Sequence, residues 1–404
     1  MPRDKTRDLR KMNRRNFLSK LSAMGISGAT LQYMTKDALA EVTDDPTDEI
    51  PRLQSMRRKY PDWQERDFPE KLEREPVYYT IQRDDWVRVE SARDAASRVG
   101  KFIDERIDDP SEIRVGVTTI VDGQHSKKAV KVKVKTESVS RVRERLPASI
   151  NGEVGSGQHK EVRENIPVVV DEDRAEKLHD CRHNDNNSYY NEDYGHVPGG
   201  AQVEACTSGA PAWDYDREEV VMLTAAHCVG AGEGTDTEYH GETMNQPENG
   251  SLMGESDKVS HESDNYEDVA TINPELSSEP VPSYKLASWG GGEDEPIWGI
   301  IGWDCIKDME DGNAPYDQMY KQGETTGRCS GPVDYTNLPD YSNGHQEFNT
   351  DAWAEGGDSG GPNFVMEDDH VLIAGITKAG LQGGANYTAA DAVEYIEDIF
   401  NLSI

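Results

Sequence analysis

Apolar positions in the first 180 residues recur with two different periods. Between residues 91 and 107 they return every three or four positions and charges fill the rest, which predicts a helix with one buried face. Short runs rich in β-branched and aromatic residues predict strands at 77–81, 113–120, 130–135 and 166–170, and a short helix is expected at 138–145. The pattern predicts a small α+β module over residues 76–180.

The pattern changes after residue 196, where short apolar runs replace the long helical period. Residues 219–223 and 269–272 are apolar or β-branched, which is typical of buried strands. Thr388 to Asp391 has the spacing of a capping box, so an amphipathic helix is expected to begin there. Its apolar positions are Ala392, Val393, Ile396, Ile399 and Phe400.

Ser359 and His227 have the surroundings of a nucleophile and its base. Ser359 lies in the run 355–363 between two pairs of glycines, which let the backbone turn sharply and leave the hydroxyl uncrowded. A serine hydroxyl is a weak nucleophile until a base takes its proton. His227 follows a predicted strand and three small residues and precedes Cys228. This setting favours a functional histidine over an ordinary core or surface histidine.

A carboxylate is needed to orient the imidazole of such a base. Asp268 comes directly before an apolar strand, so it can be buried against His227. Asp264 is an alternative, because most aspartates of so acidic a chain are expected to be solvated. The chain order His, Asp, Ser favours Asp268.

These motifs resemble the chymotrypsin-like serine peptidases, whose triad has the same chain order. The secreted bacterial branch of streptogrisin and α-lytic peptidases is the most similar within that family. The resemblance covers residues 196–404, and the segments that carry it are 206–209, 224–228, 322–327, 354–361 and 375–380. It implies an all-β double Greek-key barrel with a C-terminal helix. The implied activity is that of a serine-type endopeptidase, a hydrolase that forms an acyl-enzyme through His227, Asp268 and Ser359.

The resemblance also implies roles for the residues next to the nucleophile. The backbone N–H groups of Gly357 and Ser359 are expected to form the oxyanion hole. Asp358 is expected to be buried and structural, with Lys321 as its partner or, alternatively, as a solvated lysine.

Four residues are expected to line the substrate cleft by the same resemblance: Trp353, Thr377, Lys378 and Gly380. Trypsin-like members carry an aspartate where this chain has Trp353, which argues against a preference for lysine or arginine. Glutamate-specific members carry a histidine where this chain has Thr377. The sequence leaves the substrate side chain open.

Five cysteines are compatible with an exported protein. The resemblance implies a disulfide between Cys206 and Cys228. Elimination then suggests Cys305 with Cys329, although the usual partner position in the family falls nearer Tyr320. Cys181 is left as a free thiol outside the peptidase-like segment.

The charge of the chain is −34, and almost all of the excess lies in its second half. Residues 196–404 hold 40 acidic and 7 basic residues, whereas residues 1–195 hold 37 and 36. Molar salt shortens the Debye length to about 3 Å and screens such self-repulsion. The distribution indicates adaptation to high salt and a halophilic archaeal source; an acidic face for a cationic substrate is the alternative. Residues 196–404 lack clustered lysine and arginine, so a nucleic-acid partner is not expected for this segment.

The N-terminal 40 residues resemble a twin-arginine signal peptide. Arg14 and Arg15 precede a weakly apolar stretch that is too polar to span a membrane, and Ala38 and Ala40 supply a cleavage pattern. A basic disordered start is the alternative. We expect a secreted protein without a stable membrane span.

Three further segments complete the expected organisation: a charged linker at 41–75, the α+β module at 76–180 and an exposed connector at 181–195. By the resemblance, residues 41–195 are a pro-segment and the chain is a zymogen; a permanent accessory domain is the alternative. The expected partners are protein or peptide substrates and the chain's own pro-segment, and a monomer is expected. No cofactor or metal is expected, since the His and Cys spacing does not resemble a zinc site. A catalytically silent homologue that acts as a binding module is the alternative function.

Overall fold

The computed structural model of the chain divides it into two compact units. Unit 1 comprises residues 1–54, 76–173 and 311–315, and unit 2 comprises residues 55–75, 174–310 and 316–404. The residues that the structure describes are 48–59, 73–107, 113–122, 125–134, 138–172, 180–182, 190–248, 250–261, 267–274, 281–288, 293–337, 345–378 and 388–404. The expected signal peptide, Asp264 and Gly380 lie outside the described residues.

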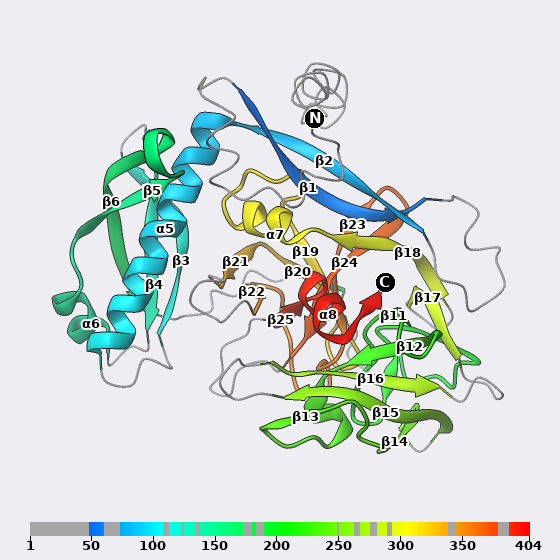
Figure 1. The fold of residues 1–404 in the computed structure, drawn as a ribbon. Coiled ribbons are helices and arrows are strands. Elements are labelled where there is room, and N and C mark those ends of the chain that lie inside the picture. Colours follow the sequence, from blue (N-terminus) through cyan, green and yellow to red (C-terminus); the bar gives the residue numbers. More distant parts are fainter. Residues whose placement is uncertain are drawn as a thin grey trace. The chain divides into compact units, whose positions relative to one another are not determined.

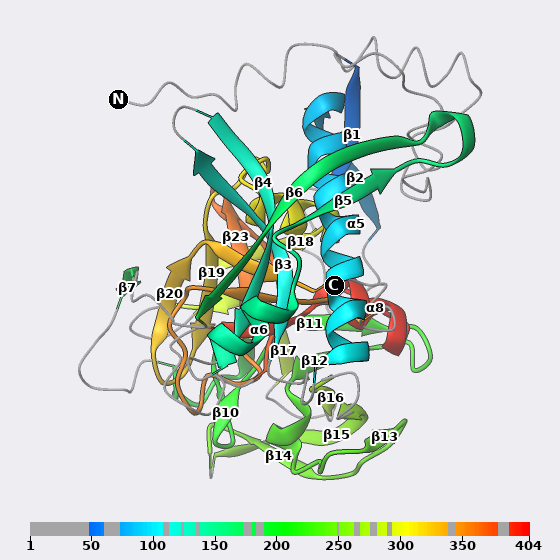
Figure 2. The same cartoon turned by 90° about the vertical axis from the view of Figure 1, so that its left-hand side faces the viewer.

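Unit 1 contains a four-stranded sheet with one long helix against it (Figure 2). The strands lie in the order β3 (Arg114–Asp122), β4 (His125–Val134), β6 (Glu161–Glu172) and β5 (Ser149–Val154). β4 and β6 are parallel, and the two outer pairs are antiparallel. The helix is α5 (Arg83–Arg106); the shorter helices α6 (Val139–Arg145) and η4 (Gly157–His159) lie between strands in sequence. This arrangement confirms the predicted α+β module.

Two details of unit 1 differ from the sequence-based expectation. Helix α5 begins at Arg83 rather than residue 91. Asp84 and Asp85 lie in its first turn, where their negative charges interact favourably with the positive end of the helix dipole. Strand β5 was not predicted. A Cβ at its Gly152 would lie 1.8 Å from the carbonyl oxygen of Ser91, so only glycine allows the strand and helix α5 to approach this closely.

Most strands of unit 2 lie in two large sheets (Figure 1). The first has seven strands, and neighbouring strands are antiparallel. Their order is β13 (Thr235–Thr237), β15 (Ser251–His261), β16 (Val269–Pro274), β12 (Glu219–Thr224), β11 (Pro211–Asp214) and β26 (Leu402–Ser403), with β14 (Thr243–Gln246) on β15.

The second sheet has thirteen strands. Its main path is β2 (Arg74–Gln82), β1 (Glu49–Arg58), β18 (Glu293–Ile301), β24 (His370–Thr377), β23 (Pro362–Glu367), β19 (Met319–Gly323), β20 (Gly327–Gly331) and β7 (Asp180–Arg182). The branches are β17 (Val281–Ala287), β8 (His196–Gly199), β25 (Thr388–Ala392), β22 (Glu347–Thr350) and β21 (Val333–Thr336). Outside the two sheets lie the pair β9 (Gln202–Val203) and β10 (Cys206–Thr207) and the helices η5 (Ala226–Val229), α7 (Trp303–Glu310) and α8 (Val393–Phe400).

One hydrophobic cluster joins the two sheets of unit 2. Leu223 from the first sheet, Ile373 and Phe364 from the second, and Val393 and Phe400 from α8 are all buried in it. The mostly β architecture closed by a C-terminal helix is therefore confirmed. Among the described residues, no helix combines the length and the apolar character that a membrane span requires.

Two expectations about local structure are wrong. Residues 49–58 form strand β1 instead of a charged linker, and Ser55 to Arg57 pair with β18 inside unit 2. Residues 388–392 form strand β25 instead of a capping box, and α8 begins only at Val393. Both places hold a charged side chain that is buried in an ion pair, although the sequence suggests a solvated one. Arg52 of β1 pairs with Glu90, and Asp391 of β25 pairs with Lys378.

Candidate active site

His227 lies at the end of a buried strand in unit 2. After β12 the chain makes one 3₁₀ turn, η5, which ends at Gly230 with φ +74°. Ala225 and Ala226 are fully buried, so their small side chains let the turn pack closely against the sheet. The side chain of His227 itself is 37% exposed and reaches the surface.

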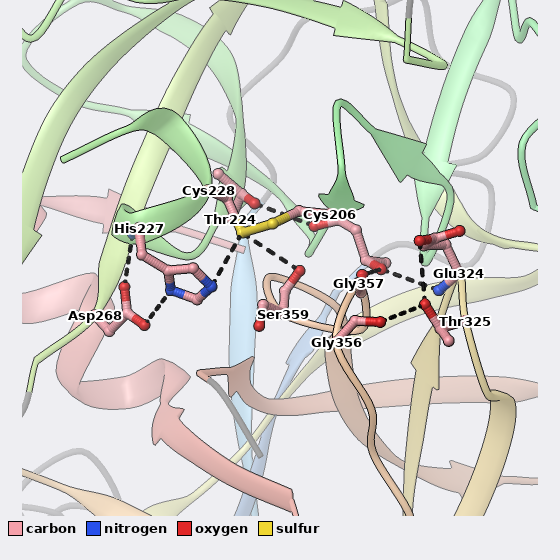
Figure 3. Close-up of a disulfide and its surroundings, with 11 residues drawn as sticks. Cys206, Thr224, His227, Cys228, Asp268, Glu324, Thr325, Gly356, Gly357 and Ser359 are labelled. Carbon is pink, nitrogen blue, oxygen red and sulfur yellow. Dashed lines mark hydrogen bonds and ion pairs between the residues drawn. A yellow bond between two sulfur atoms is a disulfide. The ribbon is translucent and has the colours of Figure 1, made fainter. Parts of the chain in front are cut away.

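Asp268 holds His227 through two hydrogen bonds (Figure 3). It directly precedes β16, the neighbour of β12 in the first sheet. Its Oδ1 accepts the backbone N–H of His227 at 2.9 Å, and its Oδ2 lies 2.6 Å from Nδ1 of the imidazole. The hydrogen bond to Asp268 raises the pKa of His227, against the opposing effect of burial. The carboxylate therefore fixes the ring and leaves its Nε2 edge free to face outward.

A disulfide ties the histidine turn to a neighbouring strand. Cys206 in β10 and Cys228 are joined, with their Cα atoms 6.0 Å apart. The predicted disulfide is therefore present, and it joins Cys228, the residue after His227, to strand β10.

Ser359 lies in a loop between two glycines of positive φ. Gly357 has φ +99° and Gly360 has φ +87°, and a Cβ on Gly360 would lie 2.2 Å from the carbonyl oxygen of Thr207. The Ser359 carbonyl accepts the N–H of Thr207 at 2.9 Å, and Gly360 N–H donates to the Thr377 carbonyl at 2.7 Å. The loop is thus held from both sides, next to the histidine turn.

Ser359 faces the Nε2 edge of His227 in Figure 3. Within the part of the chain that the structure describes, the two side chains are not joined by a hydrogen bond. Nε2 instead lies 3.7 Å from Sγ of Cys228, which is itself 3.7 Å from the Ser359 carbonyl oxygen. In enzymes without substrate such catalytic hydrogen bonds are often long and shorten only in the substrate complex.

Two threonine hydroxyls hold the peptides that precede Ser359. Thr325 Oγ1 donates to the Gly356 carbonyl at 2.7 Å, and Thr207 Oγ1 donates to the Gly357 carbonyl at 2.7 Å. In a trans peptide the N–H points opposite to the carbonyl. The Gly357 N–H therefore points away from Thr325. A Cβ at Gly357 would lie 2.2 Å from Thr325 Oγ1, which explains the glycine.

Asp358 is buried and fully supplied with donors. Its Oδ2 is 2.6 Å from Nζ of Lys321, and both side chains are 0% exposed. Oδ2 also accepts from Thr326 Oγ1 at 2.6 Å and from Glu355 N–H at 2.9 Å. Oδ1 accepts two backbone N–H groups, from Thr325 and Thr326, at 3.0 Å each. Burial lowers the pKa of Lys321, while the charge and hydrogen bond of Asp358 oppose that shift.

The residues expected in the substrate cleft are largely covered. Thr377 is fully buried, and its Oγ1 accepts from Asn363 Nδ2 at 2.9 Å. Lys378 is 8% exposed and forms ion pairs with other buried groups. Trp353 is half-buried.

Asp391 is a buried site residue that the sequence did not identify. Its carboxylate is 1% exposed, and its Oδ2 accepts the backbone N–H of Asp268 at 3.0 Å. The sequence signal pointed to a helix cap, and only the pairing of β25 with β22 and β24 places Asp391 beside the backbone of Asp268.

The second expected disulfide is wrong. Cys305 in α7 is buried and takes part in no disulfide among the described residues, whereas Cys329 is disulfide-bonded. The antiparallel ladder between β7 and β20 sets Cys181 opposite Cys329. Cys181 and Cys329 are far apart in sequence, so this pairing of strands could not be anticipated from local pattern.

Two groups of described residues have side chains of the metal-ligand type, but neither suits a metal ion. Cys206, His227 and Cys228 form one group, and both of its sulfurs are used by the disulfide. His345, Glu347 and Asp391 form the other. The ammonium of Lys378 lies 2.9 Å from Glu347 and 2.7 Å from Asp391, where a cation would bind.

Residues 217–399 match the family model of trypsin. Among solved structures, a glutamic acid specific serine protease is similar at 19% identity and TM-score 0.37, covering 51% of this chain and 98% of that one. Cellulomonas bogoriensis chymotrypsin is similar at 18% identity and TM-score 0.36, covering 52% and 98%. Thermobifida fusca protease A is similar at 16% identity and TM-score 0.34, covering 52% and 97%. No curated protein matches the chain.

Proposed function

We propose that this chain, whose residues 217–399 match the family model of trypsin, is a secreted serine endopeptidase with Ser359 as its nucleophile. His227 is the general base and Asp268 orients it. The observation that carries this proposal is the double hydrogen bond of Asp268 to the backbone and the ring of His227, with the glycine-flanked Ser359 at the opposite edge of the ring.

The reaction would begin when Ser359 Oγ attacks a peptide carbonyl and Nε2 of His227 takes the hydroxyl proton. Because Nδ1–H donates to Asp268, Nε2 of the neutral ring carries a lone pair and can accept that proton. The imidazolium that forms is stabilised by the adjacent carboxylate. It then protonates the leaving amine, and water releases the acyl group by the same steps in reverse order.

The developing oxyanion would be bound by the N–H groups of Gly357 and Ser359. In comparable enzymes the loss of a single donor lowers kcat by about 100- to 1000-fold. Support comes from the two threonine hydroxyls that fix the carbonyls of Gly356 and Gly357, because they hold the donor peptide in one orientation.

The nucleophile loop would be formed without a newly cut N-terminus. Asp358 already receives the ammonium of Lys321, a hydroxyl and three backbone N–H groups from within unit 2. A carboxylate with these partners needs no further cation. We therefore infer that processing would control access to the site rather than assemble it.

The N-terminal part of the chain is proposed to act as a pro-segment, with a signal for export before it. Residues 55–75 belong to the same compact unit as the triad, and Arg57 forms an ion pair with Glu367 there at 2.5 Å. Removal of this strand would leave Glu367 buried without that partner. N-terminal sequencing of the secreted product decides whether it begins before residue 55 or after residue 182.

Adaptation to high salt is proposed from the charge of residues 196–404. Each of their seven cationic side chains forms an ion pair, so little positive charge remains to offset the 40 carboxylates. Folding and activity should then require molar KCl. Equal activity and stability in dilute buffer would contradict this part of the proposal.

A serine-directed phosphonate tests the proposed chemistry. It should label the wild-type protein and the control variant Ser403→Ala, but not Ser359→Ala, and peptide hydrolysis should follow the same pattern. Ser403 is a buried serine of β26 in the same unit, so the control carries the same deletion of a hydroxyl. Hydrolysis retained by Ser359→Ala would overturn the assignment.

A further inference from the structure

Asp391 binds groups from three separate segments of unit 2 with one buried carboxylate. Its Oδ1 accepts from Lys378 Nζ at 2.7 Å, at the end of β24, and lies 2.8 Å from Nε2 of His345, ahead of β22. Its Oδ2 accepts the backbone N–H of Asp268 at 3.0 Å. Asp391, His345 and Lys378 are all 8% exposed or less.

The charges around Asp391 keep it ionised. Burial raises the pKa of Asp391, but the charge of Lys378 and the hydrogen bond from His345 lower it further, to about 2. Burial lowers the pKa of Lys378, and the carboxylates of Asp391 and Glu347 more than offset this, so its pKa is raised. Because an ionised carboxylate only accepts hydrogen bonds, Nε2 of His345 carries the proton that it donates.

Asp391 connects the second sheet, which carries its own strand, to the residue that precedes β16 of the first sheet. The proposed triad residues are divided between these two sheets. His227 follows β12 and Asp268 directly precedes β16, both strands of the first sheet, whereas the loop of Ser359 leads into β23 of the second sheet. Strand β25, which carries Asp391, pairs with β22 and β24 of that second sheet. The bond to the Asp268 N–H therefore fixes the catalytic carboxylate relative to the sheet that carries the nucleophile.

We propose that Asp391, held by Lys378 and His345, is a positioning residue of the catalytic triad. It acts through the backbone of Asp268 and touches no reacting atom. This inference rests on the proposed triad and adds a residue to it. A displacement of about 1 Å at a reacting group can cost about 100-fold in rate, so a single bond at the Asp268 backbone is sufficient to matter.

The first test is Asp391→Ala, with rates expressed per Ser359 titrated by the phosphonate. We expect kcat to fall about 100-fold with little change in KM, as for lost positioning. The acid limb of kcat/KM should also move to lower pH, because Asp268 raises the pKa of His227 and a displaced Asp268 raises it less. The titratable groups that face Asp391 are His345, Glu347 and Lys378, and Tyr395 packs on the His345 ring with centroids 5.2 Å apart.

A pair of double variants separates positioning from folding, since Asp391→Ala leaves Lys378 buried beside fewer carboxylates. Lys378→Met combined with Asp391→Asn removes both charges but keeps a carbonyl for the Asp268 N–H, and His345 can accept from the amide in its other tautomer. Lys378→Met combined with Asp391→Ala removes the acceptor as well. We expect the Asn variant to be at least tenfold more active per titrated serine than the Ala variant, with the wild-type acid limb.

Asp214→Asn is the matched control. Asp214 is an equally buried carboxylate of unit 2. It lies 3.0 Å from the buried ammonium of Lys258 and accepts the backbone N–H groups of Asp216 and Arg217 rather than any group of the triad. It should lose stability without a shift of the acid limb. Equal rates and acid limbs in the two double variants would overturn the positioning role. An inactive wild-type protein would instead overturn the proposed function itself.

Discussion

Arg74 and Glu397 form a two-pronged ion pair although 323 positions separate them in sequence. Nη1 and Nη2 of Arg74 donate to Oε1 and Oε2 of Glu397 at 2.7 and 2.9 Å. Glu397 also accepts the backbone N–H of Ile404 at 2.7 Å. Arg74 thus holds helix α8 and the strand after it, both of which lie against the core shared by the two sheets.

Arg74→Met should destabilise unit 2 by about 3 to 5 kcal/mol, because it leaves a buried carboxylate without its cation. Burial raises the pKa of Glu397, and the charge of Arg74 opposes that shift. Without Arg74 the pKa of Glu397 rises further, so the folded state holds the Glu397 proton more tightly. The loss of stability relative to the wild type therefore grows as the pH increases. Denaturant titrations at pH 5 and pH 8 measure it.

Lys59→Met is the control for Arg74→Met. Lys59 pairs with Glu73 at 2.9 Å, but the two side chains are 48% and 62% exposed, and such pairs contribute little. A variant at Arg74 that is as stable as the one at Lys59 would contradict the prediction.

Thr325→Val should lower kcat by about 10- to 100-fold with little change in KM, because its hydroxyl fixes the Gly356 carbonyl and so the Gly357 N–H, the proposed oxyanion donor. The loss is smaller than removal of the donor itself. Thr336→Val, which removes a buried hydroxyl bonded to Glu310, is the control and should keep wild-type kcat. An unchanged kcat for Thr325→Val would show that the donor peptide is held by other contacts.

The sequence predicted those parts of the fold whose apolar pattern follows the final secondary structure. The period over residues 91–107 and the alternation at 130–135 identified α5 and β4, because their apolar faces are the buried ones. Strand β1 was missed, since its buried positions include Arg52 and Arg58, which read as solvated in a linear pattern. Arg58 is instead covered in unit 2, and burial lowers its pKa to about 10.

The site divides in the same way. Ser359 and His227 are marked by local residues, so the sequence alone could propose them, and the disulfide of Cys206 with Cys228 that it predicted is present. Asp391 carries no such mark. Its proposed role depends on the pairing of β25 with β24 and on the ion pair with Lys378. The sequence had instead suggested that Lys378 lines the substrate cleft. Long-range pairing of this kind is not encoded in any short window of the chain.

Asp268→Asn should lower kcat by about 10,000-fold, because the amide would donate to Nδ1 and leave the proton on Nε2, the atom that accepts from Ser359 in the proposed mechanism. In the wild type Asp268 raises the pKa of His227, so the acid limb of kcat/KM should lie above the ordinary value of 6.5. In the variant the acid limb of the residual kcat/KM should lie at lower pH than in the wild type, because Asp268 no longer raises the pKa of His227. Asp257→Asn, at a buried carboxylate paired with Arg217, is the control; an unshifted limb in Asp268→Asn would contradict the assignment.

Glu394→Gln should make unit 2 more stable at alkaline pH. Glu394 accepts the backbone N–H of Trp303 at 2.7 Å, a bond that the glutamine carbonyl can also accept. Burial raises its pKa from 4.5 to about 7, against the opposing effect of that bond. The folded state then binds a proton that the unfolded state has lost, so wild-type stability falls as the pH rises from 4.5 through 7, by up to about 3 kcal/mol. We expect the variant to exceed the wild type by that amount at pH 8 and to match it near pH 4.5, whereas Glu233→Gln, at an exposed position, should show no such divergence. Parallel stability curves for Glu394→Gln and the wild type would show that Glu394 stays ionised in the folded protein.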